Sequence, residues 1–257
     1  MYFYLYDSFL NNKKYVSTLA KIENRLIDLG INGKIDKLSV LKSAQEAIED
    51  SVKNGVDTIV AVGNDKTFAK IVPIVAKQNG LTLGFIPLED NVIAKFLGIP
   101  TGEKACDTLS SRLIERIDLG KANDFYFFSE LNIPESEDLT LECNGGHFRI
   151  NSVNHSNVIK ICNLTYASLK GNFKSRKLCD PNDGLLEAIF TPASTGLLGK
   201  NQLDFNKRSV FPIRKIKIKS DHSLSLVADG ETVIKTPVIV QVVPKKLKLI
   251  VGKERKF

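Results

Sequence analysis

Three short stretches contain the residue types that phosphoryl transfer requires. They are Gly63 to Thr67, Asp180 to Glu187, and Asp229-Gly230-Glu231. Such chemistry uses backbone amides to hold phosphate, carboxylates to hold Mg²⁺, and a further carboxylate to orient or deprotonate the attacking hydroxyl. The glycines, aspartates and glutamates of these stretches could supply all three kinds of group.

The first stretch lies where a buried strand gives way to a helix. Thr58 to Val62 is largely apolar and rich in β-branched residues, which is typical of a strand buried on both faces. After Gly63-Asn64-Asp65-Lys66-Thr67, apolar residues recur at helical spacing. A strand that turns into a helix presents backbone N–H groups and a helix N-terminus, which suits phosphate. The alternative is a turn kept for purely structural reasons.

The two Asp-Gly turns also have alternatives. Oxygen ligands on the Asp183-Gly184 turn suit Mg²⁺, but the dipeptide can equally serve only to make the bend. A carboxylate on the Asp229-Gly230 turn can orient a hydroxyl, and partial burial beside an acidic neighbour would raise its pKa. The alternative at this turn is an ordinary type I′ hairpin, for which Asp-Gly is a strong signal.

The first half of the chain alternates between strand and helix patterns. This alternation predicts an α/β domain with a parallel sheet, helices on both faces, and a ligand crevice at the carboxyl ends of the strands. A capping-box pair, Ser43 and Glu46, begins one of the helices. The expected strands are Tyr2 to Tyr6, Ile35 to Val40, Thr58 to Val62 and Leu81 to Ile86, and the expected helices are Tyr15 to Leu29, Ser43 to Asn54, the segment after Gly63, and Glu103 to Ile117.

After about Asp118, short alternating runs separated by turn signals replace the helical pattern. They predict a second, mostly antiparallel β domain. We therefore expect an α/β domain over residues 1–120 and a β-rich domain over 121–257. The last strand, Leu247 to Val251, is expected to return to the first domain. The expected turns include Asn144-Gly145-Gly146.

Composition describes ordinary soluble material, with 257 residues, 43% hydrophobic and 25% charged. No apolar run approaches the length of a membrane span, and the N-terminus lacks a signal pattern. The widely spaced cysteines indicate reduced thiols and a cytoplasmic protein. His147, His155 and His222 have no metal-ligand spacing, which argues against zinc.

The net charge of +7 favours anionic partners such as nucleotides or acidic lipid headgroups. Basic residues from Lys245 to Lys256 suit either peripheral contact with the inner membrane face or a solvated strand and tail. Because no aromatic residues interleave with them, nucleic acid is not an expected partner. An edge strand of the β domain could pair across a homodimer.

Two segments in order carry a family resemblance. Gly63-Asn64-Asp65-Lys66-Thr67 resembles the G-G-D-G-T loop of the diacylglycerol kinase-like lipid kinases. Ile86-Pro87 followed by Asn91 to Pro100 resembles the family segment I-P-x-G-T-x-N-D-F-A-R-x-L-G-I-P. Together with matches near Asp183 and Asp229, the resemblance covers nearly the whole chain. It implies a two-domain fold, ATP and Mg²⁺ as cofactors, and a lipid at the membrane surface as acceptor.

The resemblance also implies roles for individual residues. Asp229 corresponds to the general base, and Glu231 to the glutamate that supports it. Asp183 corresponds to a ligand of a supporting Mg²⁺, aided by the carbonyl of Leu185 and by Asp180. The implied nucleotide contacts are Gly63, Asn64, Asp65, Lys66, Thr67, Ser8, Ser39 and Asn91.

The chain departs from the family pattern at the nucleotide loops. Asn64 and Lys66 replace two glycines, and the family's N-P-x-S-G loop is replaced by Tyr6 to Asn12. Leu88-Glu89-Asp90 replaces the G-T pair and would place acidic side chains beside the triphosphate. We therefore carry three hypotheses: an ATP-dependent lipid kinase, a catalytically inactive nucleotide- or lipid-binding homologue, and a relative of the NAD kinases.

Overall fold

The computed structural model describes residues 1–39, 43–134, 138–143, 148–151, 157–164, 179–195, 201–203 and 208–257. It divides into two compact units. The first consists of Met1–Ile117 with Lys246–Phe257, and the second of Asp118–Lys245.

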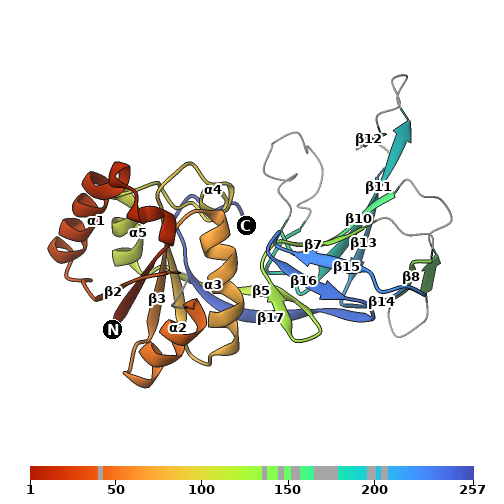
Figure 1. Cartoon of the computed structure of the whole chain (residues 1–257), viewed down its shortest axis with the longest axis horizontal. Coiled ribbons are helices and arrows are strands. Elements are labelled where there is room, and N and C mark those ends of the chain that lie inside the picture. Colours follow the sequence, from red (N-terminus) through yellow and green to blue (C-terminus); the bar gives the residue numbers. More distant parts are fainter. Residues whose placement is uncertain are drawn as a thin grey trace. The chain divides into compact units, whose positions relative to one another are not determined.

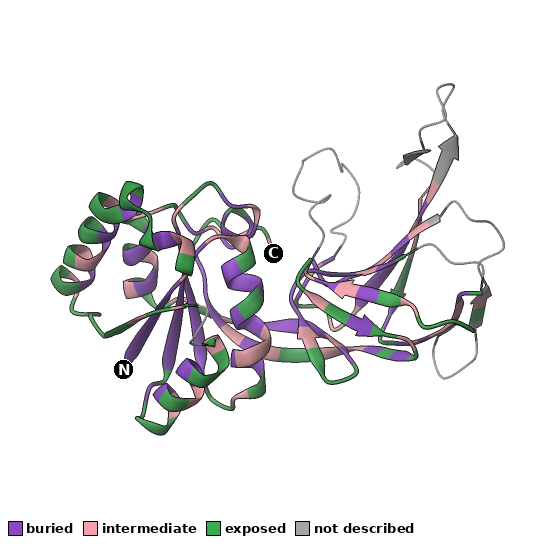
Figure 2. Ribbon diagram, in the orientation of Figure 1, coloured by how far each residue is buried: buried purple, intermediate pink, exposed green. Residues whose placement is uncertain are grey.

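The first unit contains a parallel sheet, as expected. Its strands lie in the order β2 (Lys34–Lys37), β1 (Tyr2–Tyr6), β3 (Thr58–Gly63), β4 (Thr82–Pro87) and the end of β17 (Val238–Ile250). Lys248 and Leu249 of β17 pair in parallel with Thr82 and Leu83 of β4. β1, β3 and β4 are buried along their whole length (Figure 2), which explains their continuous apolar runs.

Helices cover both faces of this sheet (Figure 1). α1 packs with α5, and α2 packs with α3, which also contacts β3 and β4. Their bounds are α1 (Val16–Asp28), α2 (Ala44–Lys53), α3 (Asp65–Lys77), α4 (Val92–Phe96) and α5 (Lys104–Ser111), with 3₁₀ turns η1 (Ser8–Asn11) and η2 (Lys13–Tyr15) before α1.

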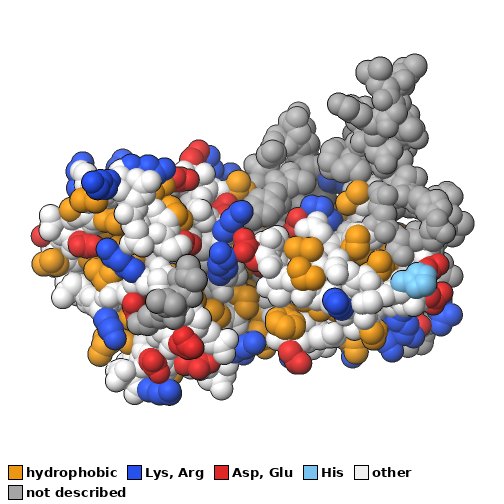
Figure 3. Space-filling model, in the orientation of Figure 1, with side chains coloured by type: hydrophobic (Ala, Val, Ile, Leu, Met, Phe, Trp, Pro, Cys, Tyr) orange, Lys and Arg blue, Asp and Glu red, His pale blue; other side chains and the backbone are white. Residues whose placement is uncertain are grey.

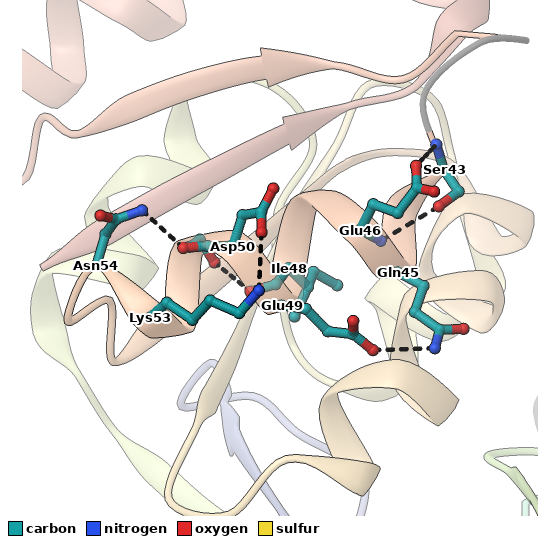
Figure 4. A network of polar contacts seen from close by, with 9 residues as sticks. Ser43, Gln45, Glu46, Ile48, Glu49, Asp50, Lys53 and Asn54 are labelled. Carbon is teal, nitrogen blue, oxygen red and sulfur yellow. Dashed lines mark hydrogen bonds and ion pairs between the residues drawn. The ribbon is translucent and has the colours of Figure 1, made fainter.

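The expected capping box begins α2 (Figure 4). Ser43 Oγ accepts the Glu46 N–H at 3.2 Å, and Glu46 Oε2 accepts the Ser43 N–H at 3.4 Å. At the other end, Asn54 Nδ2 donates to the carbonyl of Asp50 at 2.7 Å. Local side chains therefore satisfy backbone groups at both ends of the helix.

One helix is shorter in the structure than the sequence predicts. Glu103 to Ile117 was expected to be helical, but α5 ends at Ser111 because Arg112 adopts a left-handed conformation with φ of 46°. Strand β5 (Ile114–Ala122) then begins. The strand expected over Ile35 to Val40 is shorter among the described residues, where β2 ends at Lys37 and Val40 lies outside them.

The second unit contains two largely antiparallel sheets with a shared apolar core. The first comprises the beginning of β17 with β14 (Lys215–Lys219), β8 (Thr140–Cys143), β9 (Phe148–Asn151), β5 and β6 (Phe125–Phe127). The second comprises β12 (Asn201–Leu203), β11 (Leu186–Thr195), β10 (Asn157–Cys162), β7 (Glu130–Ile133), β15 (Ser225–Ala228), β16 (Thr232–Lys235) and β13 (Ser209–Ile213).

Some sequence expectations fall outside the described residues, namely the Asn144-Gly145-Gly146 turn, His147 and His155. The four cysteines are buried free thiols. His222 is exposed and lies 3.7 Å from the carboxylate of Asp138. No helix in the described part of the chain is long and apolar enough to cross a membrane.

Candidate functional site

The Gly63–Thr67 loop of the first unit is closed by its own side chains. Asn64 caps α3, with its Oδ1 accepting the Thr67 N–H at 3.1 Å. Thr67 Oγ1 in turn accepts the Asn64 N–H at 3.1 Å. Asn64 has extended backbone, with φ of −122°, so replacing glycine there requires no left-handed conformation. Lys66 is exposed in the first turn of α3.

Gly63 is required by the close packing of this loop. A Cβ added at Gly63 would lie 2.3 Å from Oγ1 of Thr67 and 2.9 Å from its Cβ. The glycine therefore allows the threonine side chain to close over the end of β3.

Asp7 joins the end of β1 to this loop, a role that the sequence analysis did not assign. Its N–H donates to the carbonyl of Val62 at 3.1 Å, and its Oδ2 accepts a hydrogen bond from Thr67 Oγ1 at 2.6 Å. Ser8, a residue expected to contact the nucleotide, donates its hydroxyl to Asp7 Oδ1 at 3.3 Å. The sequence feature that could have identified Asp7 is its position as the first polar residue after an apolar strand.

Asp65 connects the loop to the second family-like segment. Its carboxylate accepts the N–H groups of Val92 and Ile93, at 2.9 and 3.2 Å, and so caps α4. Burial raises the pKa of this carboxyl, while the two backbone hydrogen bonds oppose the rise. Asn91, which is 7% exposed, leaves its Nδ2 buried without a hydrogen-bond partner. The structure thus brings Asp65 and Asn91 together.

The two acidic residues that replace the family's G-T pair are both paired within the first unit. Glu89 accepts a hydrogen bond from the Tyr15 hydroxyl at 2.5 Å and lies 3.8 Å from Lys14. Asp90 pairs with Lys95 at 2.5 Å. These contacts offset the negative charge expected to repel a triphosphate. Figure 3 shows acidic and basic side chains interspersed on the visible face of this unit.

Ser39, another residue expected to contact the nucleotide, is exposed and lies just beyond the end of β2.

In the second unit, Asp229 occupies the turn between β15 and β16. Asp229 and Gly230 have φ values of 50° and 73°, as a type I′ turn requires, and the Glu231 N–H closes the turn on the carbonyl of Ala228 at 3.0 Å. The side chain has a further role. Its carboxylate accepts three backbone N–H groups, from Phe128 at 2.7 Å, Ser129 at 2.7 Å and Glu130 at 3.0 Å.

The surroundings of Asp229 favour a proton on its carboxylate. Burial raises the pKa of Asp229 to about 6, against the opposing effect of the three N–H donors, and the charge of Glu130 adds to the rise. Glu231, the expected supporting glutamate, is exposed. The buried glutamate next to Asp229 is Glu130, which the sequence analysis missed because it is remote in the chain.

The Asp180–Leu185 turn contains the expected metal ligands. Asp183 Oδ1 accepts the Leu185 N–H at 2.9 Å, and Asp180 Oδ1 accepts the Asn182 N–H at 3.1 Å. Burial, followed by the charges of Asp180 and Asp118, raises the pKa of Asp183. Within the described residues, no three His, Cys, Asp or Glu side chains are arranged to hold a metal ion.

Asp118, also missed from sequence, fixes this turn. It is 1% exposed, and its Oδ2 accepts the Gly184 N–H while its Oδ1 accepts the Lys245 N–H, both at 2.7 Å. Its occurrence between Ile117 and Leu119 was the signal, since an acid within an apolar strand needs buried partners.

Residues 3–122 match the family model described as the diacylglycerol kinase catalytic domain. The diacylglycerol kinase of Bacillus subtilis (strain 168) is 28% identical over 129 residues, a match that covers 49% of this chain and 43% of that protein. A Streptococcus pneumoniae serotype 4 protein named "Putative lipid kinase" is 26% identical over 238 residues, with 78% and 81% covered.

Solved structures share the fold. A diacylglycerol kinase from Bacillus anthracis str. Sterne superposes with a TM-score of 0.75 at 18% identity, covering 99% of this chain and 98% of that one. An NAD kinase from Archaeoglobus fulgidus, solved in complex with ATP, superposes with a TM-score of 0.63 at 16% identity, covering 99% and 95%. The expected two-domain fold class is therefore confirmed.

Proposed function

We propose that the chain is an ATP-dependent lipid kinase, because residues 3–122 match the family model described as the diacylglycerol kinase catalytic domain. It would transfer a phosphoryl group to the hydroxyl of a lipid. The observation that carries the proposal is the Asp229 carboxylate, which is fixed by three backbone N–H groups and has a pKa raised to about 6.

Asp229 has the properties of a general base for a hydroxyl group. A base is most effective when its pKa lies near the working pH, because it is then ionised yet still accepts a proton. With a pKa of about 6, Asp229 is mostly ionised at neutral pH. The three N–H donors fix the orientation of the carboxylate, and such positioning is the main protein contribution to phosphoryl transfer.

The first unit would hold ATP through the start of α3 and its neighbours. The buried, unpartnered Nδ2 of Asn91 is a hydrogen-bond donor available to a ligand, and the exposed Lys66 can offer its ammonium to phosphate. The residues proposed to contact the nucleotide are Gly63, Asn64, Asp65, Lys66, Thr67, Ser8, Ser39 and Asn91.

Asp180, Asp183 and the carbonyl of Leu185 provide the oxygen donors that Mg²⁺ prefers, and water would complete the coordination. When bound, Mg²⁺ neutralises phosphate charge. We further propose a cytoplasmic protein that forms a homodimer by pairing an edge strand of the β domain and meets its lipid at the inner membrane face. The net charge of +7 supports attraction to an acidic surface.

A catalytically inactive binding protein is the second candidate, and a specific observation favours it. Asn64, Thr67 and Asp7 already satisfy one another, and the Asp65 carboxylate caps α4. A loop closed in this way has fewer polar groups left for a triphosphate. Both candidates allow a ligand to stabilise the fold, so only turnover distinguishes the kinase from the binding protein.

The test measures phosphate transfer from labelled ATP, with Mg²⁺, to a series of lipid alcohols in mixed micelles, beginning with diacylglycerol. We expect transfer by the natural chain and at least a hundredfold loss in Asp229→Asn. Thermal shift with ATP and Mg²⁺ verifies that the variant is folded and binds nucleotide. A Mg²⁺-dependent shift without transfer to any lipid would establish the binding protein, and transfer that survives in Asp229→Asn would refute the assignment of the base.

A further inference from the structure

Two hydrogen bonds join Glu130 and Asp229, one between their backbones and one from the Glu130 backbone to the Asp229 carboxylate. The Asp229 N–H donates to the carbonyl of Glu130 at 2.8 Å, and the Glu130 N–H donates to Asp229 Oδ1 at 3.0 Å. The strand pairing beside them, Ala228 of β15 with Leu131 of β7, holds the two residues at the same end of the sheet. Any movement of the Glu130 backbone would therefore move the Asp229 carboxylate.

The Glu130 side chain is itself buried as part of an ion pair. Leu131 and Ile133 of β7 point into the apolar core, so Glu130 and Asn132 lie on the opposite face of the strand. Glu130 Oε1 accepts Lys160 Nζ at 2.8 Å and Asn132 Nδ2 at 3.2 Å. Its Oε2 is buried without a hydrogen-bond partner, and the residue is 8% exposed.

A contribution to the stability of the fold does not by itself account for the buried Glu130 carboxylate. The Lys160 side chain is about a third exposed, so solvent screens its attraction to the buried Glu130, and the unpartnered carboxylate oxygen of Glu130 adds a desolvation cost. Buried groups of this kind concentrate at sites where they adjust the protonation of a functional group. Here the functional group whose protonation Glu130 and Lys160 would adjust is the neighbouring Asp229 carboxylate.

We propose that Glu130 is a positioning residue for Asp229, which it holds in place and keeps ready to accept a proton, with Lys160 as its counter-ion. The proposal rests on the assignment of Asp229 as the base in the proposed function. It replaces Glu231, which the family resemblance implied as the supporting carboxylate and which is exposed here.

The charges around Asp229 act in opposite directions. Burial has the largest effect and raises the pKa of Asp229, and the like charge of Glu130 raises it further. From β10, Lys160 partly neutralises Glu130 through their contact at 2.8 Å. From the far side of the turn, Glu231 faces solvent, where its charge is screened. Glu130 and Lys160 together therefore adjust how readily Asp229 takes up a proton.

The test follows the titration of Asp229 by carboxyl carbon NMR in the full chain without ligand, with Asp229→Asn to identify the signal. Glu130→Gln keeps the size of the side chain and its acceptor for Lys160 but removes the charge. We expect it to lower the titration midpoint by about one pH unit. Glu231→Gln, the matched removal of a nearby carboxylate, is expected to change the midpoint by less than about 0.3 unit. An unchanged midpoint in Glu130→Gln, or an equal change in Glu231→Gln, would overturn the proposal.

A second pair of variants covers the case in which Glu130→Gln does not fold. Lys160→Met removes the counter-ion and should raise the midpoint, whereas Lys160→Arg keeps the charge and should restore it. A midpoint that Lys160→Met leaves unchanged would count against the proposal. Because these titrations need no substrate, they can succeed even if no lipid is phosphorylated, and that combination would refute the proposed function alone.

In an active enzyme, the acid side of the profile of kcat/KM against pH should move with the NMR midpoint in each variant. A purely structural role for Glu130 would lower the rate equally at every pH. The difference between a shifted pH profile and a uniform loss of rate therefore distinguishes a residue that positions the base from one that only supports the fold.

Discussion

In the Gly63–Thr67 loop the side chains of Asn64 and Thr67 accept each other's backbone N–H groups, whereas the Asp229 carboxylate accepts three backbone N–H groups that are remote in the chain. Asn64 and Thr67 exchange hydrogen bonds at 3.1 Å, and Asp7 completes the set. Asn64, which replaces a glycine of the family pattern, thus contributes a side chain that stabilises the loop. The Asp229 turn keeps the Asp-Gly-Glu pattern and its left-handed backbone.

The two regions also differ in the state of their buried polar groups. In the described part of the first unit, one buried side-chain atom lacks a partner, Asn91 Nδ2. Among the described residues of the second unit there are four such atoms, including Oε2 of Glu130 and of Glu187. Burial raises the pKa of Asp229 to about 6 and that of Glu187 to about 7. Strain and unpartnered groups typically gather where chemistry occurs, so the second unit retains more of the features of a reactive site.

The largest expected effect comes from removing the carboxylate in each region. Asp229→Ala should lower turnover by about 10²–10⁴-fold and, by leaving three N–H groups without an acceptor, destabilise the fold by about 3 kcal/mol. Asp65→Ala removes the cap of α4 and should cost about 1 kcal/mol. Initial rates and urea unfolding measure both. Equal losses of stability and turnover in the two variants would remove the distinction between the regions.

Gly63→Ala should produce the next largest effect, on stability. Its Cβ would lie 2.3 Å from Thr67 Oγ1, so the threonine must move and its hydrogen bonds break, at a cost of about 2 kcal/mol. Thr67→Ala in the same chain removes the obstructing atom, and the double variant should lose less than the sum of the single losses. Additive losses in urea unfolding would show that the side chains do not close the loop.

Local patterns in the sequence were sufficient to predict much of the fold. Ser43 and Glu46 form their capping box because the required partners lie three residues apart. The end of α5 could not be anticipated in the same way. The apolar residues up to Ile117 continue a helical spacing, but Arg112 turns the chain into β5, and that choice depends on the sheet.

The candidate site was predictable only where a motif marked it. Asp229 was found because it lies in an Asp-Gly-Glu turn, but Glu130 is separated from it by nearly a hundred residues of sequence and meets it through strand pairing. Asp7 and Asp118 likewise act on backbone groups remote in the chain. A single sequence does not encode such pairings in any local pattern, so the networks that orient the motifs were missed.

The dependence of activity on pH tests the second region by itself. Turnover should fall as the pH drops through about 6, because Asp229 becomes protonated and cannot accept the proton of a hydroxyl. Each pH unit below that point should reduce kcat/KM about tenfold. Stability should change in the opposite sense, since the folded state binds this proton more tightly than the unfolded chain. The contribution of Asp229 to stability is therefore full below pH 3.8 and is lost as the pH rises through about 6. A flat activity profile between pH 5 and 8, values chosen on either side of about 6, would contradict the assignment of the base.

The smallest effect on stability, and the sharpest test of the first region, is expected from Lys66→Ala. Because Lys66 is exposed at the start of α3, its removal should change the free energy of unfolding by less than about 0.5 kcal/mol. If its ammonium replaces the amide contacts of the lost glycine, the Kd for ATP should rise about tenfold, and more at low salt than at high salt. Lys70→Ala, on the same helix and also exposed, is the matched control. Equal Kd values for the two variants would make Lys66 an ordinary surface residue, and the loop would then differ from the Asp229 turn in keeping shape without a binding charge.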